Sequence, residues 1–178
     1  MKLFNVTMAV RRCRSTGLVL LGLAVVGAST AIAADGPLIE GLNLSKGKLQ
    51  GQDYSNHRLV GINFAGADLR GANFEGAELN GLNMSGARLE GASFKNAVMT
   101  QLNLMNAVLT GADFTAATGD NINFMSSDLK SSCFDGTKLE LVNMTGADLD
   151  GAMAPGLNLG VIVPPDAFAS VGEGPCNN

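Results

Sequence analysis

Large apolar residues recur at every fifth position along most of the chain. Of the 24 such positions from Leu44 to Leu159, only Gly119 and Ala154 hold a small residue. A helix turns about 100° per residue, so a step of five would spread these side chains around a helix and leave no buried stripe. The residues two positions earlier are mostly Ala or another apolar residue, as in a strand whose alternate residues share one side. The pattern therefore predicts short extended segments separated by turns.

A second period, of twenty residues, predicts how these segments are arranged. Asn recurs at this spacing, each time after a bulky apolar residue, at Asn43, Asn63, Asn83, Asn103, Asn123 and Asn143. The five-residue centres sort by the same period into a Leu series beginning at Leu49 and an aromatic series beginning at Tyr54. Four segments would therefore close one coil, and successive coils would pair in parallel at ~4.8 Å. We predict an all-β, quadrilateral β-helix of about six coils, right-handed because parallel crossovers prefer that hand.

Two features of this ladder have more than one interpretation. The Asn series could present amides to a repeating ligand such as a glycan, or it could be a structural ladder of stacked amides, which we favour. Gly119 stands where Leu or Met is expected. A missing side chain at this position predicts either a void in the core or a bulge in the strand.

The first 33 residues have the features of a cleaved secretory signal peptide. Four basic residues precede the apolar run 18–26, and Ala31-Ile32-Ala33 matches the small-x-small motif of a cleavage site. The apolar run is short for a membrane span. Arg11-Arg12 leaves the choice between general and twin-arginine export open. We predict an extracytoplasmic location, periplasmic or secreted, or the thylakoid lumen in a phototroph, with no membrane span after cleavage.

These patterns divide the chain into four parts. Residues 1–33 are the predicted signal peptide, and residues 34–41 are a lead-in or N-terminal cap. The β-helix is predicted over 42–161, and residues 162–178 are a C-terminal capping tail that does not follow the repeat.

Composition restricts the chemistry that the folded part can carry. Residues 1–33 hold four of the twelve Lys and Arg and none of the sixteen Asp and Glu, leaving eight basic against sixteen acidic residues, a net charge of −8. An acidic chain is not expected to bind nucleic acid directly. With one His and three Cys in the whole chain, we expect no zinc site, no His-based hydrolase, no cofactor and no enzymatic activity.

The runs GADLRGANFEGAEL, from Gly66 to Leu79, and TGADLDGA, from Thr145 to Ala152, resemble the A-(D/N)-L-x-x repeat of the pentapeptide repeat family. The resemblance covers residues 42–159 and implies a right-handed quadrilateral β-helix. The family includes bacterial DNA mimics that bind DNA gyrase, exported proteins of the periplasm or thylakoid lumen, and many members with no known role. The export signal of this chain departs from the gyrase-binding members.

Two function classes follow from these observations. We predict a non-enzymatic exported scaffold that binds another protein through a flat wall of the β-helix; the alternative is an acidic DNA mimic that regulates DNA gyrase. A homodimer is also left open. Outward positions turn apolar in the middle coils, and they form the candidate partner surface: Val98, Met105, Val108 and Met125.

Two cysteines remain after the predicted cleavage, Cys133 and Cys176. Cys133 directly precedes the central Phe134 and should face outward, while Cys176 lies in the tail. A tail folded over the open end of the β-helix could bring Cys176 to Cys133, and an oxidising compartment would favour a disulfide. Two free thiols or an intermolecular bond are the alternatives.

Overall fold

The chain divides into two compact units, Met1–Ala33 and Ala34–Asn178. The computed structural model describes residues 11–12, 19–20, 37–155, 158–162 and 176. In the first unit, β1 (Arg11–Arg12) pairs antiparallel with β2 (Val19–Leu20). Most of the predicted apolar run and the predicted cleavage motif lie outside the described residues. The boundary between the units falls at the predicted cleavage position.

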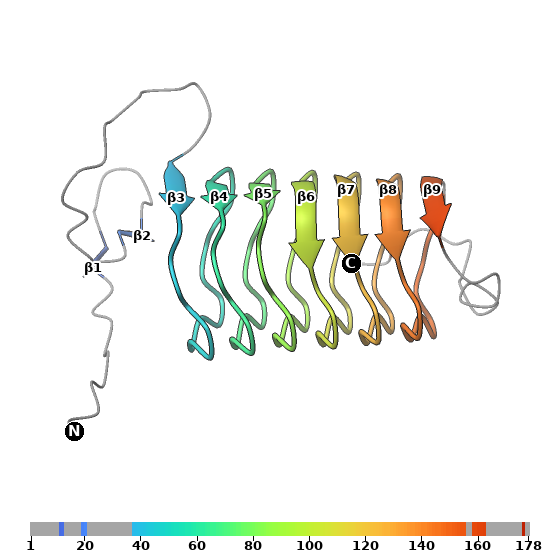
Figure 1. Ribbon diagram of the computed structural model, residues 1–178, viewed down its shortest axis with the longest axis horizontal. Helices are drawn as coiled ribbons and strands as arrows, with labels where there is room; N and C mark the ends of the chain where they lie inside the picture. The colour runs from blue at the N-terminus through green and yellow to red at the C-terminus, as the bar shows by residue number, and fades with distance from the viewer. Residues whose placement is uncertain (1–10, 13–18, 21–36, 156–157, 163–175, 177–178) are drawn as a thin grey trace. The chain divides into compact units, whose positions relative to one another are not determined.

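The second unit contains one parallel sheet whose seven strands follow the order of the sequence. Figure 1 shows them as a straight row from β3 to β9. Each strand pairs with the strand twenty residues further on, as Leu59 does with Leu79. The strands are β3 (Leu38–Glu40), β4 (Arg58–Val60), β5 (Glu78–Asn80), β6 (Val98–Asn103), β7 (Thr118–Asn123), β8 (Lys138–Asn143) and β9 (Asn158–Ile162).

The other three sides of each coil are held by single parallel bridges with the same spacing. One ladder of bridges begins at Asn43, one at Lys48 and one at Asp53, and each continues in steps of twenty. Together with the sheet, they make a four-sided solenoid. The predicted all-β, quadrilateral β-helix is confirmed. Among the described residues, no helix is long and apolar enough to cross a membrane.

The four sides are named here by their outward residues. The strand wall carries β3 to β9. The amide wall carries the ladder Asn43 to Asn143, and the charged wall carries the ladder Lys48 to Asp148. The disulfide wall carries the ladder from Asp53 through Asp113 and Cys133 to Met153.

The chain turns a corner at every fifth residue from Gly41 to Gly151, and each of these residues has a positive φ. Glycine adopts this conformation without steric cost, which explains the high glycine content. Ten corners carry another residue, among them Ala116 and Leu141. The left-handed conformation is strained for side chains such as Ala116 and Leu141, whereas Asn, which holds four of the ten corners, tolerates it.

The interior is filled by the two inward positions of each segment. The five-residue centres from Leu49 to Leu149 are buried, apart from Gly119, and Ala fills most of the positions two residues earlier. The aromatic series stacks from coil to coil, with ring centroids 5.1 Å apart between Tyr54 and Phe74 and 4.8 Å apart between Phe94 and Phe114. Stacked identical residues explain why the sequence repeats both residue type and spacing.

Gly119 marks neither a void nor a bulge. It pairs in register with Met99 on one side and Leu139 on the other, so the strand is continuous. A Cβ atom added to Gly119 would lie 3.0 Å from Cδ2 of Leu139 and 3.3 Å from Cγ1 of Ile122. Neighbouring core side chains therefore occupy the space that a larger residue would fill, and both sequence interpretations were wrong.

The ladder begins earlier than the sequence analysis proposed. β3 lies within the predicted lead-in 34–41, yet it pairs with β4 in the same twenty-residue register. Ile39 stands five residues before Leu44 and continues the series of centres. At the other end, β9 pairs with β8 as far as Ile162, with a register shift between Glu140 and Val142.

Candidate interaction surfaces

The amide wall has no charged residue at its outward positions. Beside the Asn ladder it carries Ser45, Ala65, Ser85, Met105, Met125 and Thr145. The corner that leads into this wall carries Gly41, Gly61, Gly81, Gln101, Asn121 and Leu141. The corner that leads out of it carries one charge, Lys46, followed by Gly66, Gly86, Asn106, Ser126 and Gly146. The other three walls all carry charges, so this wall is the exception on an acidic protein.

Each Asn of the ladder closes its own turn. The Oδ1 atom accepts a hydrogen bond from the backbone N–H two residues on, as from Ala65 to Asn63 at 3.0 Å and from Met125 to Asn123 at 3.0 Å. Amides also bond between coils, since Nδ2 of Asn63 donates to Oδ1 of Asn43 at 3.3 Å. Such turns and ladders are how Asn stabilises bent backbone. These hydrogen bonds support the structural interpretation of the Asn ladder.

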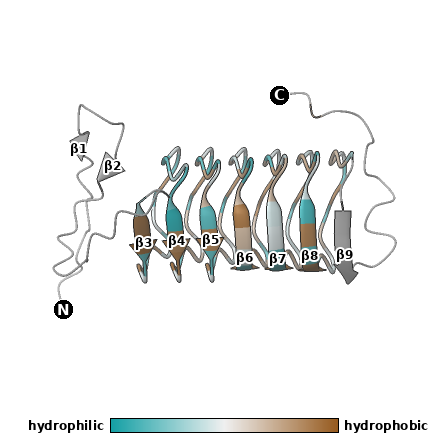
Figure 2. Cartoon of the chain, turned by 90° about the horizontal axis from the view of Figure 1, so that it is seen from above, coloured by the Kyte–Doolittle hydropathy of each residue, from teal (hydrophilic) through white to brown (hydrophobic). Residues whose placement is uncertain are grey.

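Large apolar residues lie only in the C-terminal part of the amide wall. Met105 and Met125 occupy equivalent positions one coil apart and are half-buried. Leu141 stands at the corner beside them and is 63% exposed, with a φ of 50°. β8 accordingly changes from hydrophilic to hydrophobic along its length (Figure 2). Leu141 was not identified from the sequence. A Leu at a corner position that is usually held by Gly could have indicated it.

The structure does not bring the four predicted partner residues together. Met105 and Met125 share the amide wall, but Val98 lies in β6 on the strand wall, where it is 48% exposed. Val108 belongs to the ladder of the charged wall, between Arg88 and Asp128. Val98 and Val108 are ten residues apart, which is half a coil, so they face opposite sides.

The charged wall carries both signs in close pairs. Arg70 contacts Asp68 at 2.7 Å, Arg88 contacts Glu90 at 2.8 Å and Lys130 contacts Asp148 at 2.7 Å. The hydrogen bond from Arg70 holds the pKa of Asp68 well below its usual range, and the bond from Lys130 lowers the pKa of Asp148. Acidic side chains on this wall are therefore largely compensated by their neighbours.

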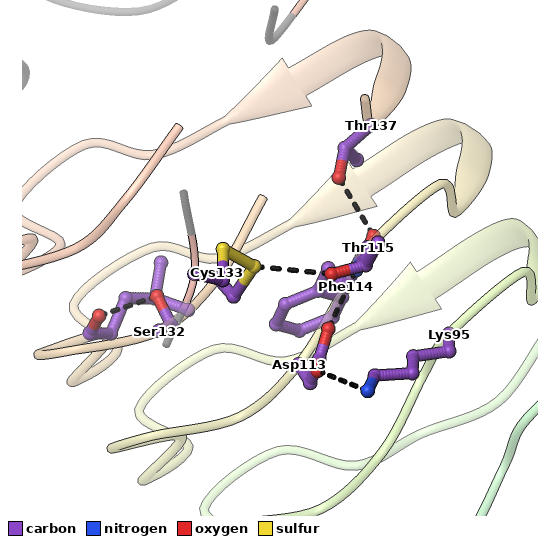
Figure 3. Close-up of a disulfide and its surroundings, with 9 residues drawn as sticks. Lys95, Asp113, Phe114, Thr115, Ser132, Cys133 and Thr137 are labelled. Atoms are coloured by element: carbon purple, nitrogen blue, oxygen red, sulfur yellow. Dashed lines mark hydrogen bonds and ion pairs between the residues drawn. A yellow bond between two sulfur atoms is a disulfide. The ribbon is translucent and has the colours of Figure 1, made fainter. Parts of the chain in front are cut away.

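The disulfide wall joins Cys133 to Cys176 (Figure 3). The two Cα atoms lie 5.8 Å apart, within the normal range for a disulfide. Cys133 stands at an outward position but is only 6% exposed. The Oγ1 atom of Thr115 lies 3.1 Å from its sulfur, and one coil earlier Lys95 contacts Asp113 at 3.0 Å. The pairing remains a prediction that thiol chemistry must test.

Candidate metal ligands are few. No group of three or more His, Cys, Asp or Glu among the described residues is placed to hold a metal ion. Nδ1 of His57 lies 2.8 Å from the carbonyl oxygen of Ser55, a local contact within one corner.

The family model of pentapeptide repeats matches residues 58–96, 83–118 and 122–159, with eight copies. No curated protein matches the chain. Among solved structures, the chain is similar to trypsin-treated QnrB1, a plasmid-mediated fluoroquinolone resistance protein. The identity is 19% and the TM-score 0.40, over 68% of this chain and 74% of that one.

Two further solved structures are similar to the chain. HetL, a protein involved in heterocyst differentiation regulation from the cyanobacterium Nostoc, is 20% identical, with a TM-score of 0.30 over 67% of this chain and 71% of that one. A protein from the Arabidopsis thaliana thylakoid lumen is 27% identical, with a TM-score of 0.23 over 69% and 72%. On the match of the family model and the coil geometry, this chain belongs to the pentapeptide repeat family.

Proposed function

We propose that the protein is an exported, non-enzymatic scaffold that docks another protein on its amide wall. The observation that carries this proposal is the wall itself: an uncharged surface that continues over several coils, with Met105, Met125 and Leu141 gathered in one part of it. Uncharged surfaces with exposed thioether and aliphatic groups are typical of protein interfaces. The interior is filled by core side chains, which suits a surface role better than a substrate cavity.

A capture experiment tests the docking surface. The native protein and a Met105→Lys, Met125→Lys double variant are used to capture proteins from the extracytoplasmic fraction. We expect the variant to lose a partner that the native protein retains, because two charges would be placed on the uncharged wall. Val98→Lys on the strand wall is the matched control and should retain that partner. If the double variant captures the same proteins as the native chain, the amide wall is not the docking surface.

The proposed export rests on the leader and its small-x-small motif. Cell fractionation and an intact-mass measurement test it. We expect a mature chain beginning at Ala34 outside the cytosol, in the periplasm, the medium or, in a phototroph, the thylakoid lumen. A cytosolic chain that still carries residues 1–33 would contradict export.

A second candidate function is that of an acidic DNA mimic acting on DNA gyrase, supported by the net charge of −8 without the leader. The paired charges of the charged wall weigh against it, because Arg70, Arg88 and Lys130 neutralise much of the acidic surface. A supercoiling assay separates the two functions. Inhibition of gyrase by the mature chain would favour the mimic, and no effect would favour the scaffold.

A further inference from the structure

The distribution of charge indicates that two copies of this chain can meet through their amide walls, because the other three walls carry more acidic than basic residues. The strand wall carries Glu40, Glu78, Asp120 and Glu140 against Arg58 and Lys138. The disulfide wall carries Asp53, Glu75, Asp113 and Asp135 against Lys95, so acidic residues outnumber basic ones on both walls. The charged wall contains both signs, but Asp128, Asp148 and Asp150 share its C-terminal part with Lys130 alone. Copies of an acidic protein repel each other when such walls approach. The amide wall carries no acidic residue, and the single charge at its described corners is Lys46 in the first coil.

The amide wall is also divided into a flat half and a bulky half. Its N-terminal coils present Gly61, Ala65, Gly81 and Ser85, which project little beyond the backbone. Its C-terminal coils present Gln101, Met105, Asn121, Met125 and Leu141. An identical wall turned end over end would lay the bulky half of each copy on the flat half of the other.

Two independent features of Leu141 raise the free energy of the isolated folded chain. Its backbone has a φ of 50°, a conformation that side chains other than Gly and Asn rarely adopt. Its side chain is 63% exposed, the largest exposure among the large hydrophobic residues of the described part of the chain. Strained and exposed residues that persist in a fold are often those that a binding partner covers.

The geometry points to a homodimer in which the amide walls of two copies face each other with the solenoids antiparallel. This inference rests on the proposed docking role of the wall and names its occupant, a second copy of this chain. A two-fold axis across the fourth of the six rungs of the wall would place Met105 opposite its own copy. The same axis sets Leu141 over Gly61 of the second copy and Met125 over Ser85 of the second copy.

The size of the wall predicts a weak dimer. The six rungs from Asn43 to Asn143 are separated by five spacings of ~4.8 Å, so the wall is about 24 Å long. Two walls of this length bury a small area, at the low end of specific interfaces. The two-fold arrangement makes the interface isologous, so it closes at two copies. We therefore expect association to depend on protein concentration.

Sedimentation or light scattering of the purified native protein over a range of concentrations measures this association. We expect the average mass to rise toward twice that of one chain as concentration increases. A Met105→Glu, Leu141→Glu double variant should stay monomeric at every concentration, since it sets like charges against each other across the two-fold axis and against the flat half. Val98→Glu on the strand wall is the matched control and should associate like the native chain. Melting curves show whether each variant remains folded.

Cross-linking tests the antiparallel arrangement separately. Met105→Cys, near the two-fold axis, should form covalent dimers with a short bifunctional maleimide. Ser45→Cys occupies the same ladder of the wall, but in the antiparallel dimer its two copies lie several coils apart, so it should not. Equal cross-linking by the two variants would overturn the arrangement. A native protein that is monomeric at all concentrations would overturn the homodimer.

The two proposals fail in different ways. A native chain that is always monomeric, yet loses a different protein on Met105→Lys, Met125→Lys substitution, keeps the docking role and rejects the second copy as its occupant. A chain that dimerises equally well with Met105→Glu, Leu141→Glu uses another surface and rejects the amide-wall homodimer, and the capture experiment then decides the docking role separately.

Discussion

The two halves of the solenoid share one ladder but differ at their corners. Between residues 41 and 91 every corner is Gly except Lys46 and Asn56, whereas between residues 96 and 151 only Gly111, Gly136, Gly146 and Gly151 are Gly. All corners have a positive φ, and the non-Gly residues other than Asn that hold one are Lys46 in the N-terminal half and Gln101, Ala116, Ser126, Ser131 and Leu141 in the C-terminal half. The C-terminal half therefore carries more backbone strain than the N-terminal half. Repeating geometry does not imply uniform stability along the rod.

The halves also differ in how their cores hold hydroxyl groups. In the C-terminal half, Ser127, Ser132 and Thr137 replace the usual Ala and donate to backbone carbonyls at 2.6 to 2.7 Å. In the N-terminal half, the buried hydroxyl of Tyr54 has no hydrogen-bond partner among the described residues. A buried hydroxyl without a partner costs more than one that is bonded. Each half therefore has its own weakness, backbone strain in one and a polar defect in the other.

Removal of the disulfide should produce the largest difference between the halves. The bond would close a loop with a sequence separation of 43 residues in the strained half. In the chain-entropy model this is worth roughly 4 kcal/mol, an upper value because strain commonly reduces it. We expect Cys133→Ser and Cys176→Ser to lower the melting temperature and to accelerate hydrogen exchange in β7 to β9 while leaving β4 and β5 unchanged.

The control for this prediction is Ser93→Ala, two coils earlier on the same ladder as Cys133, which should leave exchange in β7 to β9 unaltered. Thiol labelling of the native protein provides the complementary measurement. Two free thiols in the native protein would show that the C-terminal half stands without a covalent link.

Gly119→Leu should destabilise the C-terminal half by about 1–3 kcal/mol, the usual cost of overpacking a filled core. The new side chain would collide with Leu139 and Ile122, which already occupy the space. Thermal unfolding measures the effect, and Met99→Leu, a similar-sized exchange on the same ladder, should cost less. A variant with a raised melting temperature would mean that an unfilled cavity exists after all.

The fold was predictable because each coil repeats the same physical solution. Alternating inward positions, a corner every fifth residue and stacking of identical types every twentieth were all visible in the sequence, from Leu49 and Tyr54 onward. The environment of Gly119 was not visible, because neighbouring side chains lean into the space. Such adjustments depend on rotamers in the adjacent coils rather than on the repeat.

The candidate surface was only partly predictable. Met105 and Met125 follow from the pattern, but Val98 and Val108 were grouped with them by sequence distance, and half a coil separates these two residues on the solenoid. Leu141 was overlooked because its corner position is normally read as a turn. Sorting every outward residue by the twenty-residue period would have separated the walls from sequence alone.

Alkaline pH should expose the weakness of the N-terminal half. Burial raises the pKa of Tyr54 to about 12. In the unfolded chain this hydroxyl titrates near ~10, so its contribution to stability is complete below about pH 10 and is lost as the pH rises toward 12. Two pKa units correspond to about 2.7 kcal/mol at most. Tyr54 is the sole tyrosine in the chain, so tyrosinate absorbance reports on it alone.

Melting curves at neutral and alkaline pH measure this loss, and Tyr54→Phe is the matched variant. We expect the native protein to lose more stability than the variant as the pH rises above about 10, since Phe has no proton to lose. Tyrosinate formation in the folded protein near pH 10 would contradict the buried environment.

The smallest expected effect comes from exchanging corner residues between the halves. Leu141→Asn should stabilise the dilute protein by about 1 kcal/mol, because Asn tolerates the left-handed conformation that strains Leu. Asn121, one coil earlier, already holds this conformation with a φ of 58°. The reciprocal Gly81→Leu on the same ladder should destabilise the N-terminal half by a similar amount, because Leu would take the same strained backbone conformation. A new Cβ atom would lie within 4.0 Å of the backbone nitrogen of Gly61 alone, so few new contacts would offset that strain. Both variants are compared by thermal unfolding at low concentration, where association does not contribute. If Leu141→Asn leaves the melting temperature unchanged while Gly81→Leu lowers it, the C-terminal corners bear their residues without strain, and the difference between the halves lies in the core alone.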